Sequence, residues 1–181
     1  MSLLSLVITT MLPVYIPLQF IDKSNNYFEI PITWQIPTII LLTLIFHKNV
    51  VFKAFSIYIV LGLFIAPVFH QGGSIGYLLT PNFGYLLGLY PLIKIIDNLN
   101  TRNKINVGNF LKNGFIAICA MHVTGIFYNL LQVVFYSQFN IFLYNLGKYS
   151  VGKIGYHFLT LFPIILLIKP IKSLKHSKND Y

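Results

Sequence analysis

The sequence predicts an all-α integral membrane protein, a bundle of six transmembrane helices. Of its 181 residues, 56% are hydrophobic and 9% are charged, and the mean hydropathy is +0.71. Soluble domains carry roughly 25% charged residues, so a water-soluble fold of this size could not bury so much apolar surface. Six apolar runs along the chain supply the helices. No hydrophilic block or flexible linker divides them, which favours a single membrane domain over residues 1–181.

A helix needs about 20 residues to cross a hydrocarbon core about 30 Å thick. Several runs are shorter or contain proline, as at Pro13, Pro17 and Pro91. Such breaks are tolerated at membrane depth where neighbouring protein satisfies the backbone, and they favour a packed, solute-handling bundle over a plain anchor. In chain order, the expected spans are Leu3–Phe20, Thr33–Phe46, Phe52–Phe69, Phe83–Ile96, Phe110–Tyr136 and Tyr156–Ile171.

The basic residues indicate the orientation, because cytoplasmic loops carry an excess of Lys and Arg. With a cytoplasmic N-terminus, ten basic residues fall inside and three outside, whereas an odd number of spans would place the Lys-rich tail outside. We therefore expect a multi-pass protein of the cell membrane with both termini in the cytoplasm. The inside residues are Lys48, Lys53, Lys94, Arg102, Lys104, Lys112, Lys169, Lys172, Lys175 and Lys178, and the outside residues are Lys23, Lys148 and Lys153.

The same composition argues against several activities. Cys119 is the only cysteine, so neither a disulfide framework nor a cysteine-based metal site is expected. The histidines and acids show no metal-ligand spacing, and no P-loop is present. The net charge of +9 is spread between apolar runs and makes no face for nucleic acid. We expect no enzyme, catalytic residue, metal or cofactor, and any ATP-driven work must come from a partner.

A glycine-rich segment at residues 66–88 is the most informative outer loop. Three glycines, among them Gly72 and Gly73, and one proline stand between two spans there. Glycine tolerates positive φ and lacks a Cβ, so this backbone can fold back tightly and approach a ligand. A merely tight turn would need only about two to five residues. The segment therefore predicts a ligand-binding loop, with Asn82 and Tyr85 among its polar side chains.

The segment 30–35 is the second outer candidate, and it contains the only tryptophan. Trp34 lies between Thr33 and Gln35. An aromatic ring beside a hydroxyl and an amide could cover the apolar body of a small ligand while Gln35 pairs with a polar group. A tryptophan at the lipid–water boundary is the alternative explanation.

A polar stripe marks the fifth span. His122, Gly125, Asn129 and Gln132 recur every three or four residues and so share one helix face. Hydrogen bonding between helices is one explanation. Contact of Asn129 with a ligand is the other.

Three ordered motifs carry a resemblance to a known family. They are Pro31–Gln35 (PITWQ), Tyr58–Phe69 (YIVLGLFIAPVF), and Gly72-Gly73 followed by Pro81–Gly88 (PNFGYLLG). They resemble the BioY family, the biotin-specific substrate-binding (S) components of energy-coupling-factor (ECF) transporters, whose patterns include Pro-Ile-Thr-Leu-Gln and Gly-Pro-Thr-Gly-Gly-Tyr-Leu-Leu-Gly. The resemblance covers about residues 14 to 96.

The resemblance implies the six-helix S-component fold and the capture of biotin from outside, in a pocket covered by the first and third loops. Separate ATPase subunits and a membrane coupling protein would power uptake. Aromatic cover with Asn and Gln side chains suits a bicyclic urea that carries a carboxylate tail. The residues expected to bind or shape the site are Thr33, Trp34, Gln35, Gly72, Gly73, Asn82, Tyr85, Asn129 and Lys169.

The C-terminal half departs from the family pattern. The family ends with Pro-Gly-Asp-x-x-Lys, whose acid and lysine are associated with biotin binding. Aligned with this chain from Phe162, the pattern places Ile165 and Ile168 at those two positions, and Lys169 follows one residue later, about 100° around a helix. Two alternatives therefore stay open: an S component for another small solute, and a structural or assembly factor of a larger membrane complex.

Overall fold

The computed structural model describes residues 2–17, 27–70, 72–101, 106–136, 139–168 and 170. Most of them are helical, and residues 161–168 continue the last helix. In chain order, the elements are α1 (Ser2–Met11), β1 (Pro13–Pro17), β2 (Tyr27–Thr33), α2 (Gln35–Ile45), α3 (Lys48–Phe64), the 3-10 helix η2 (Ile75–Leu79), α4 (Pro81–Leu87), α5 (Leu89–Thr101), α6 (Val107–Tyr136), α7 (Phe139–Asn145), the π-helix η3 (Leu146–Val151) and α8 (Gly152–Leu159).

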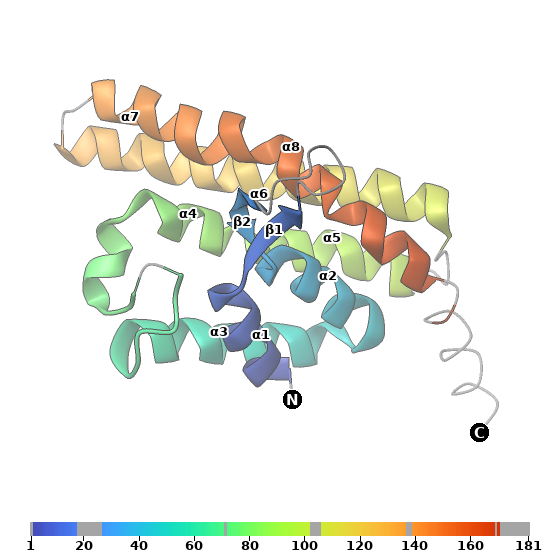
Figure 1. Cartoon of the computed structure of the whole chain (residues 1–181). Helices are drawn as coiled ribbons and strands as arrows, with labels where there is room; N and C mark the ends of the chain where they lie inside the picture. The colour runs from blue at the N-terminus through green and yellow to red at the C-terminus, as the bar shows by residue number, and fades with distance from the viewer. Residues whose placement is uncertain are drawn as a thin grey trace.

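The helices form a bundle of six rods in the described part of the chain: α1, α2, α3, α4 with α5, α6, and α7 with α8. The two long rods, α6 and α7–α8, lie side by side at the top of Figure 1, with α3 on the opposite side of the bundle. Helix α5 packs against α2, α3 and α6. Its central position explains why Leu92, Ile93 and Ile96 are fully buried.

Two rods are long and apolar enough to cross a membrane, Val107–Phe135 and the continuous run Phe139–Ile168. Their outer faces carry exposed apolar side chains, of which Val134 is 77% and Leu166 is 80% exposed. Such faces suit contact with lipid, because lipid-facing helices satisfy their own backbone groups and need no polar cover. The number of rods agrees with the six predicted spans.

The first predicted span is wrong beyond Met11, because the chain leaves the helix there. Strand β1 pairs antiparallel with β2, from Pro13 opposite Thr33 to Pro17 opposite Tyr27. Proline has no N–H to donate, and it holds the preceding residue extended. Pro13 and Pro17 therefore end the helix and favour an edge strand. The result is a hairpin that crosses the front of the bundle in Figure 1.

The third and sixth predicted spans also have different limits. Helix α3 ends at Phe64 and not at Phe69, because Pro67 follows closely. The last helix begins at Phe139 and not at Tyr156, so Lys148 and Lys153 lie within a helix and not in an outer loop. A π-helical stretch at Leu146–Val151, which contains Lys148, interrupts the regular α-helix between α7 and α8.

Glycines allow α4 and α6 to interlock. A Cβ at Gly84 would collide with the Tyr128 side chain, and one at Gly88 with Met121. In the opposite direction, a Cβ at Gly125 would collide with the Tyr85 ring. Small residues let membrane helices approach closely, so these glycines set how near α4 can come to α6.

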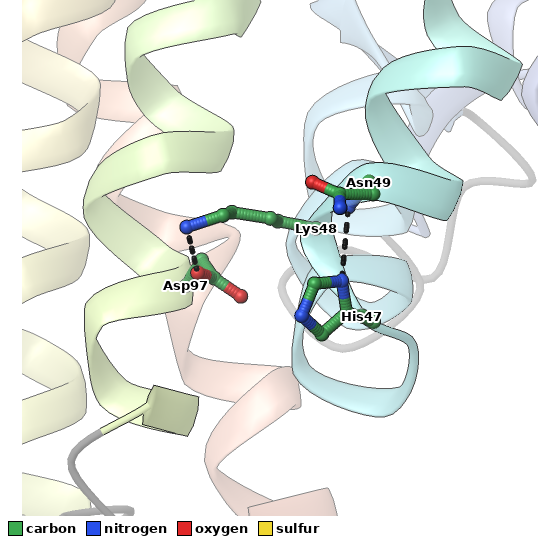
Figure 2. Close-up of polar contacts among 4 residues, drawn as sticks. All are labelled: His47, Lys48, Asn49 and Asp97. Atoms are coloured by element: carbon green, nitrogen blue, oxygen red, sulfur yellow. Dashed lines mark hydrogen bonds and ion pairs between the residues drawn. The ribbon is translucent and has the colours of Figure 1, made fainter.

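An ion pair with a buried carboxylate and a partly exposed ammonium group connects α3 to α5 (Figure 2). The Lys48 Nζ atom lies 3.5 Å from the Asp97 Oδ2 atom, and the Asp97 side chain is 3% exposed whereas that of Lys48 is 40% exposed. Next to it, the His47 ring caps α3, since its Nδ1 atom accepts a hydrogen bond from the Asn49 N–H at 3.3 Å. The start of α3 is thereby held against α5.

The ion pair yields a stability prediction. Lys48→Met should lower the free energy of unfolding, because it removes the ammonium group that faces the buried Asp97 carboxylate. The expected loss is about 1–2 kcal/mol, since an ion pair with one partly exposed partner contributes less than a fully buried pair. Thermal unfolding of the purified protein in detergent measures the change. The control is Lys53→Met on the exposed side of the same helix, and an equal effect of both variants would contradict the role of the pair.

Candidate functional site

A cavity of about 280 Å³ lies between the hairpin, α2, α4 and the two long rods. Its size approaches the roughly 300–1,000 Å³ of small-molecule sites. The wall combines an apolar part with several hydroxyl, amide, imidazole and ammonium groups. The lining residues are Pro13, Ile32, Thr33, Gln35, Ile36, His70, Tyr77, Asn82, Tyr85, Leu86, Leu89, Met121, Lys148, Tyr149, Lys153 and His157.

Four residues predicted from sequence meet at this cavity: Thr33, Gln35, Asn82 and Tyr85. They come from the end of β2, the start of α2 and the start of α4. The Gln35 Nε2 atom is buried and makes no hydrogen bond of ordinary length within the described residues, although the Tyr58 hydroxyl interacts with this side chain. Gln35 can therefore still donate to an acceptor atom of a bound molecule.

Trp34, Gly72 and Gly73 do not line the cavity. Trp34 stands before α2 with its side chain 40% exposed. Gly72 has a φ of 103° and forms a bridge with Phe69 through two backbone hydrogen bonds of 3.0 Å. Gly73 lies tightly against the backbone of Gly62 and Pro67. The two glycines thus shape the loop between α3 and η2, which carries His70 to the cavity wall.

The remaining predicted residues are elsewhere. Asn129 borders a second, smaller cavity. Lys169 lies outside the described residues. Neither Ile165 nor Ile168 lines the main cavity, and Ile168 is buried at 3% exposure in the core.

Three cavity residues that sequence reasoning missed share one face of the last helix: Tyr149, Lys153 and His157. Their spacing of four residues could have indicated this face. Lys148 and Lys153 were instead assigned to an outer loop, because charged residues are rare within transmembrane helices. Tyr77 was missed as well, and burial raises the pKa of its hydroxyl well above the usual value, so this group stays neutral in the wall.

The two lysines surround one aromatic ring. The Nζ atoms of Lys148 and Lys153 lie 5.4 Å and 5.3 Å from the centre of the Tyr149 ring. Cation–π contacts of this kind stabilise an ammonium group without neutralising it. Among the described residues, no carboxylate forms a salt bridge with either lysine. The cavity therefore carries positive charge that an anionic group can neutralise.

A hydrogen-bonded chain supports this wall from behind. The Ser150 hydroxyl is 2.7 Å from the Tyr85 hydroxyl and 3.2 Å from Nδ1 of His122. The other ring nitrogen of His122 is 3.0 Å from Nδ1 of His157. This chain joins α4, α6 and the last helix, and it fixes Tyr85 and His157 in the cavity wall.

Three of the four residues in the polar stripe on α6 contact other elements of the bundle. His122 bonds Ser150 and His157, Gly125 receives Tyr85, and the Gln132 amide donates to the Leu79 carbonyl at 2.9 Å. Of the two explanations for the stripe, hydrogen bonding and packing between helices accounts for these three residues.

The helical bundle has the S-component type of fold. The structure matches the solved S-component for biotin from an ECF-type ABC transporter with a TM-score of 0.62, over 97% of this chain and 87% of that one, at 19% sequence identity. The comparison confirms the predicted fold class, a helical membrane bundle of the S-component type.

Comparison of the sequence identifies the family within this class. The model of the BioY family matches residues 1–163, and the chain belongs to the BioY family. It is also 42% identical over 59 residues to the probable biotin transporter BioY of Lysinibacillus sphaericus. That alignment covers 33% of this chain and 30% of the relative's length.

The hydrogen-bonded chain behind the cavity predicts a large effect of one hydroxyl. Ser150→Ala should lower the free energy of unfolding by about 1–3 kcal/mol, because it removes a partner from both the Tyr85 hydroxyl and the His122 ring. Ser56→Ala, which removes one hydrogen bond of 2.8 Å to Tyr90, is the matched control. Thermal unfolding compares the two, and a smaller loss for Ser150→Ala than for Ser56→Ala would refute the prediction.

Proposed function

We propose that this protein is the substrate-binding membrane subunit of an ECF-type vitamin transporter, which captures biotin from outside for ATP-driven uptake through partner subunits. One observation carries the proposal: two lysines without a carboxylate partner among the described residues face a small-molecule cavity. A lysine at such a place binds a carboxylate by a charge-assisted hydrogen bond. Biotin is a solute with a carboxylate tail.

The rest of the wall suits the rest of biotin. Ile36, Leu86 and Leu89 supply apolar contact for the thioether ring, while the Nε2 donor of Gln35 can serve the urea oxygen. Mostly apolar walls with a few placed polar groups are the usual form of a small-ligand site. Thr33, Asn82 and Tyr85 add hydroxyl and amide groups. We propose these residues, with Lys153, as the biotin site.

Lys153 corresponds, in this proposal, to the biotin-binding lysine at the end of the family pattern Pro-Gly-Asp-x-x-Lys. Ser150 precedes it by three residues, which is the spacing of the acid and lysine in that pattern, and both lie at or just behind the cavity. The alignment through Ile165 and Ile168 has less support, because these residues are away from the cavity and the family match ends at residue 163. Ser150 then stands where the family has its acid.

A second candidate is capture of another small anionic solute. Ser150 favours it, since a hydroxyl has replaced the family's carboxylate. Either solute would be captured by a non-catalytic subunit without a cofactor. The assembly-factor alternative has lost its main support, because the polar stripe on α6 is engaged largely within the chain.

The proposed function also implies partner subunits and an orientation in the membrane. We propose a membrane coupling protein and ATPase subunits as partners, and a position across the cell membrane with both termini in the cytoplasm. The two long apolar helices support a position across the membrane, and the excess of basic residues in the predicted inner loops supports the orientation.

Binding of biotin to the purified protein is the main test. Wild type should bind biotin, and Lys153→Met should weaken binding by about 10- to 100-fold, because a hydrogen bond to a charged group contributes about 1.5–3 kcal/mol. Biotin methyl ester, which has no carboxylate, should bind equally weakly to both proteins. Isothermal titration calorimetry measures all four affinities.

Lys112→Met, at an exposed position on α6, is the control and should bind biotin like wild type. A folded wild-type protein that ignores biotin at micromolar concentration would reject biotin as the solute. Binding of another water-soluble vitamin in its place would then favour the second candidate.

Cysteine labelling tests the orientation. Cys119→Ser removes the native thiol, and single cysteines are then introduced by Ser74→Cys in the predicted outer loop and by Lys178→Cys in the tail. A membrane-impermeant maleimide should label the first in intact cells and the second only after permeabilisation. Labelling of the tail in intact cells would invert the proposed topology.

A further inference from the structure

A second cavity of about 130 Å³ lies beside the main one, between the start of α4, the end of α6 and α7. The two cavities are neighbours. Pro81 borders the smaller cavity and Asn82 the larger one, and Asn145 of the smaller cavity precedes Tyr149 of the larger by one helical turn. In the proposed orientation, the smaller cavity lies on the outer side.

Asn129 is the unusual residue of this wall. It is 2% exposed, and neither its amide oxygen nor its amide nitrogen has a hydrogen-bond partner within the described residues. The Tyr85 hydroxyl, which is 2.7 Å from the Ser150 hydroxyl, also interacts with this amide, but at a geometry that leaves both amide atoms without a hydrogen bond of ordinary length. An unpaired buried amide costs free energy, so a group that pairs with it would be bound favourably.

The surroundings limit what that group can be. A carboxamide presents a donor and an acceptor side by side, which complements the edge of another amide or of a urea. The cavity volume of about 130 Å³ is several times the roughly 30 Å³ that one water molecule occupies in the liquid. It is enough for a small cyclic urea. Among the described residues no charged side chain borders the cavity, whose wall combines apolar side chains such as Val133 and Phe142 with the amides of Gln132 and Asn145. A carboxylate would therefore be bound poorly here.

We propose that the Asn129 cavity is an outer capture subsite for the urea or amide end of the solute, occupied before the solute passes Tyr85 into the main cavity. This rests on the proposed function for the solute's identity. Tyr85 stands between the two cavities, since it lines the larger one and approaches Asn129 of the smaller. The solute would exchange the Asn129 amide for the Gln35 donor as its carboxylate reaches the lysines.

The probe is imidazolidin-2-one, a cyclic urea without a carboxylate, observed by saturation-transfer NMR on the full-length protein in lipid nanodiscs. Wild type should show saturation transfer, and Asn129→Leu should reduce it severalfold. The matched control is Asn140→Leu, which removes an exposed amide on α7 that borders neither cavity.

Binding kinetics of biotin provide the second measurement. Asn129→Leu should lower the association rate constant by about tenfold, the value of one good hydrogen bond, and leave the dissociation rate constant unchanged. A raised dissociation rate with unchanged association would place Asn129 in the final complex and overturn the capture subsite. A wild-type protein that gives no saturation transfer holds only water there, which also overturns it.

The two proposals can fail separately. If imidazolidin-2-one binds through Asn129 while biotin does not bind, the capture subsite stands and biotin is rejected. If biotin binds with the same kinetics in wild type and Asn129→Leu, biotin stands and the subsite is rejected. Because leucine could disturb packing, Asn129→Ser repeats both measurements with a smaller side chain, and thermal unfolding confirms that each variant is folded.

Discussion

The close contact between α4 and α6 is the constraint on which the site depends. Gly84 on α4 and Gly88 directly after it leave room for Tyr128 and Met121, and Gly125 on α6 leaves room for Tyr85. Any side chain at these positions would push the helices apart. The Tyr85 hydroxyl could not then reach Ser150 on the last helix, and the wall shared by the two cavities would open. In a membrane, where apolar helices gain little by leaving lipid, such close packing replaces the hydrophobic effect as the force that positions a site.

The lysines in the last helix show how charge is kept within an apolar span. Lys148 and Lys153 would be costly in contact with lipid. They are stabilised because they lie at a cavity and against the Tyr149 ring, and the π-helical stretch of η3 lies in the same part of the chain. π-Helical turns are frequent at functional sites. In the proposed function, this positive charge is what would attract the anionic group of the solute.

Local signals explain which residues of the cavity wall could be predicted from the sequence. Thr33, Gln35, Asn82 and Tyr85 stand in motifs of glycine, proline and polar residues beside helix starts, where side chains turn toward the bundle. Lys153 and His157 were missed because, in the sequence alone, a lysine between apolar residues resembles the residue of a loop between two spans. Trp34 was expected to cover the ligand and instead stands beside the cavity, since the side on which a residue points at the start of a helix depends on how the hairpin enters it. The correct face of the last helix became visible only once its true start at Phe139 was known.

The sequence by itself determined the helical membrane class, the number of helical rods and the family resemblance, because hydropathy and ordered motifs are properties of neighbouring residues along the chain. Tertiary structure decided that residues 13–17 pair as a strand, that Lys153 faces the cavity, and that Asn129 borders a cavity of its own. These outcomes depend on which surfaces meet across the bundle. Contacts such as Ser150 with Tyr85 join residues 65 positions apart, and their closeness depends on the packing of whole helices, which no local pattern encodes.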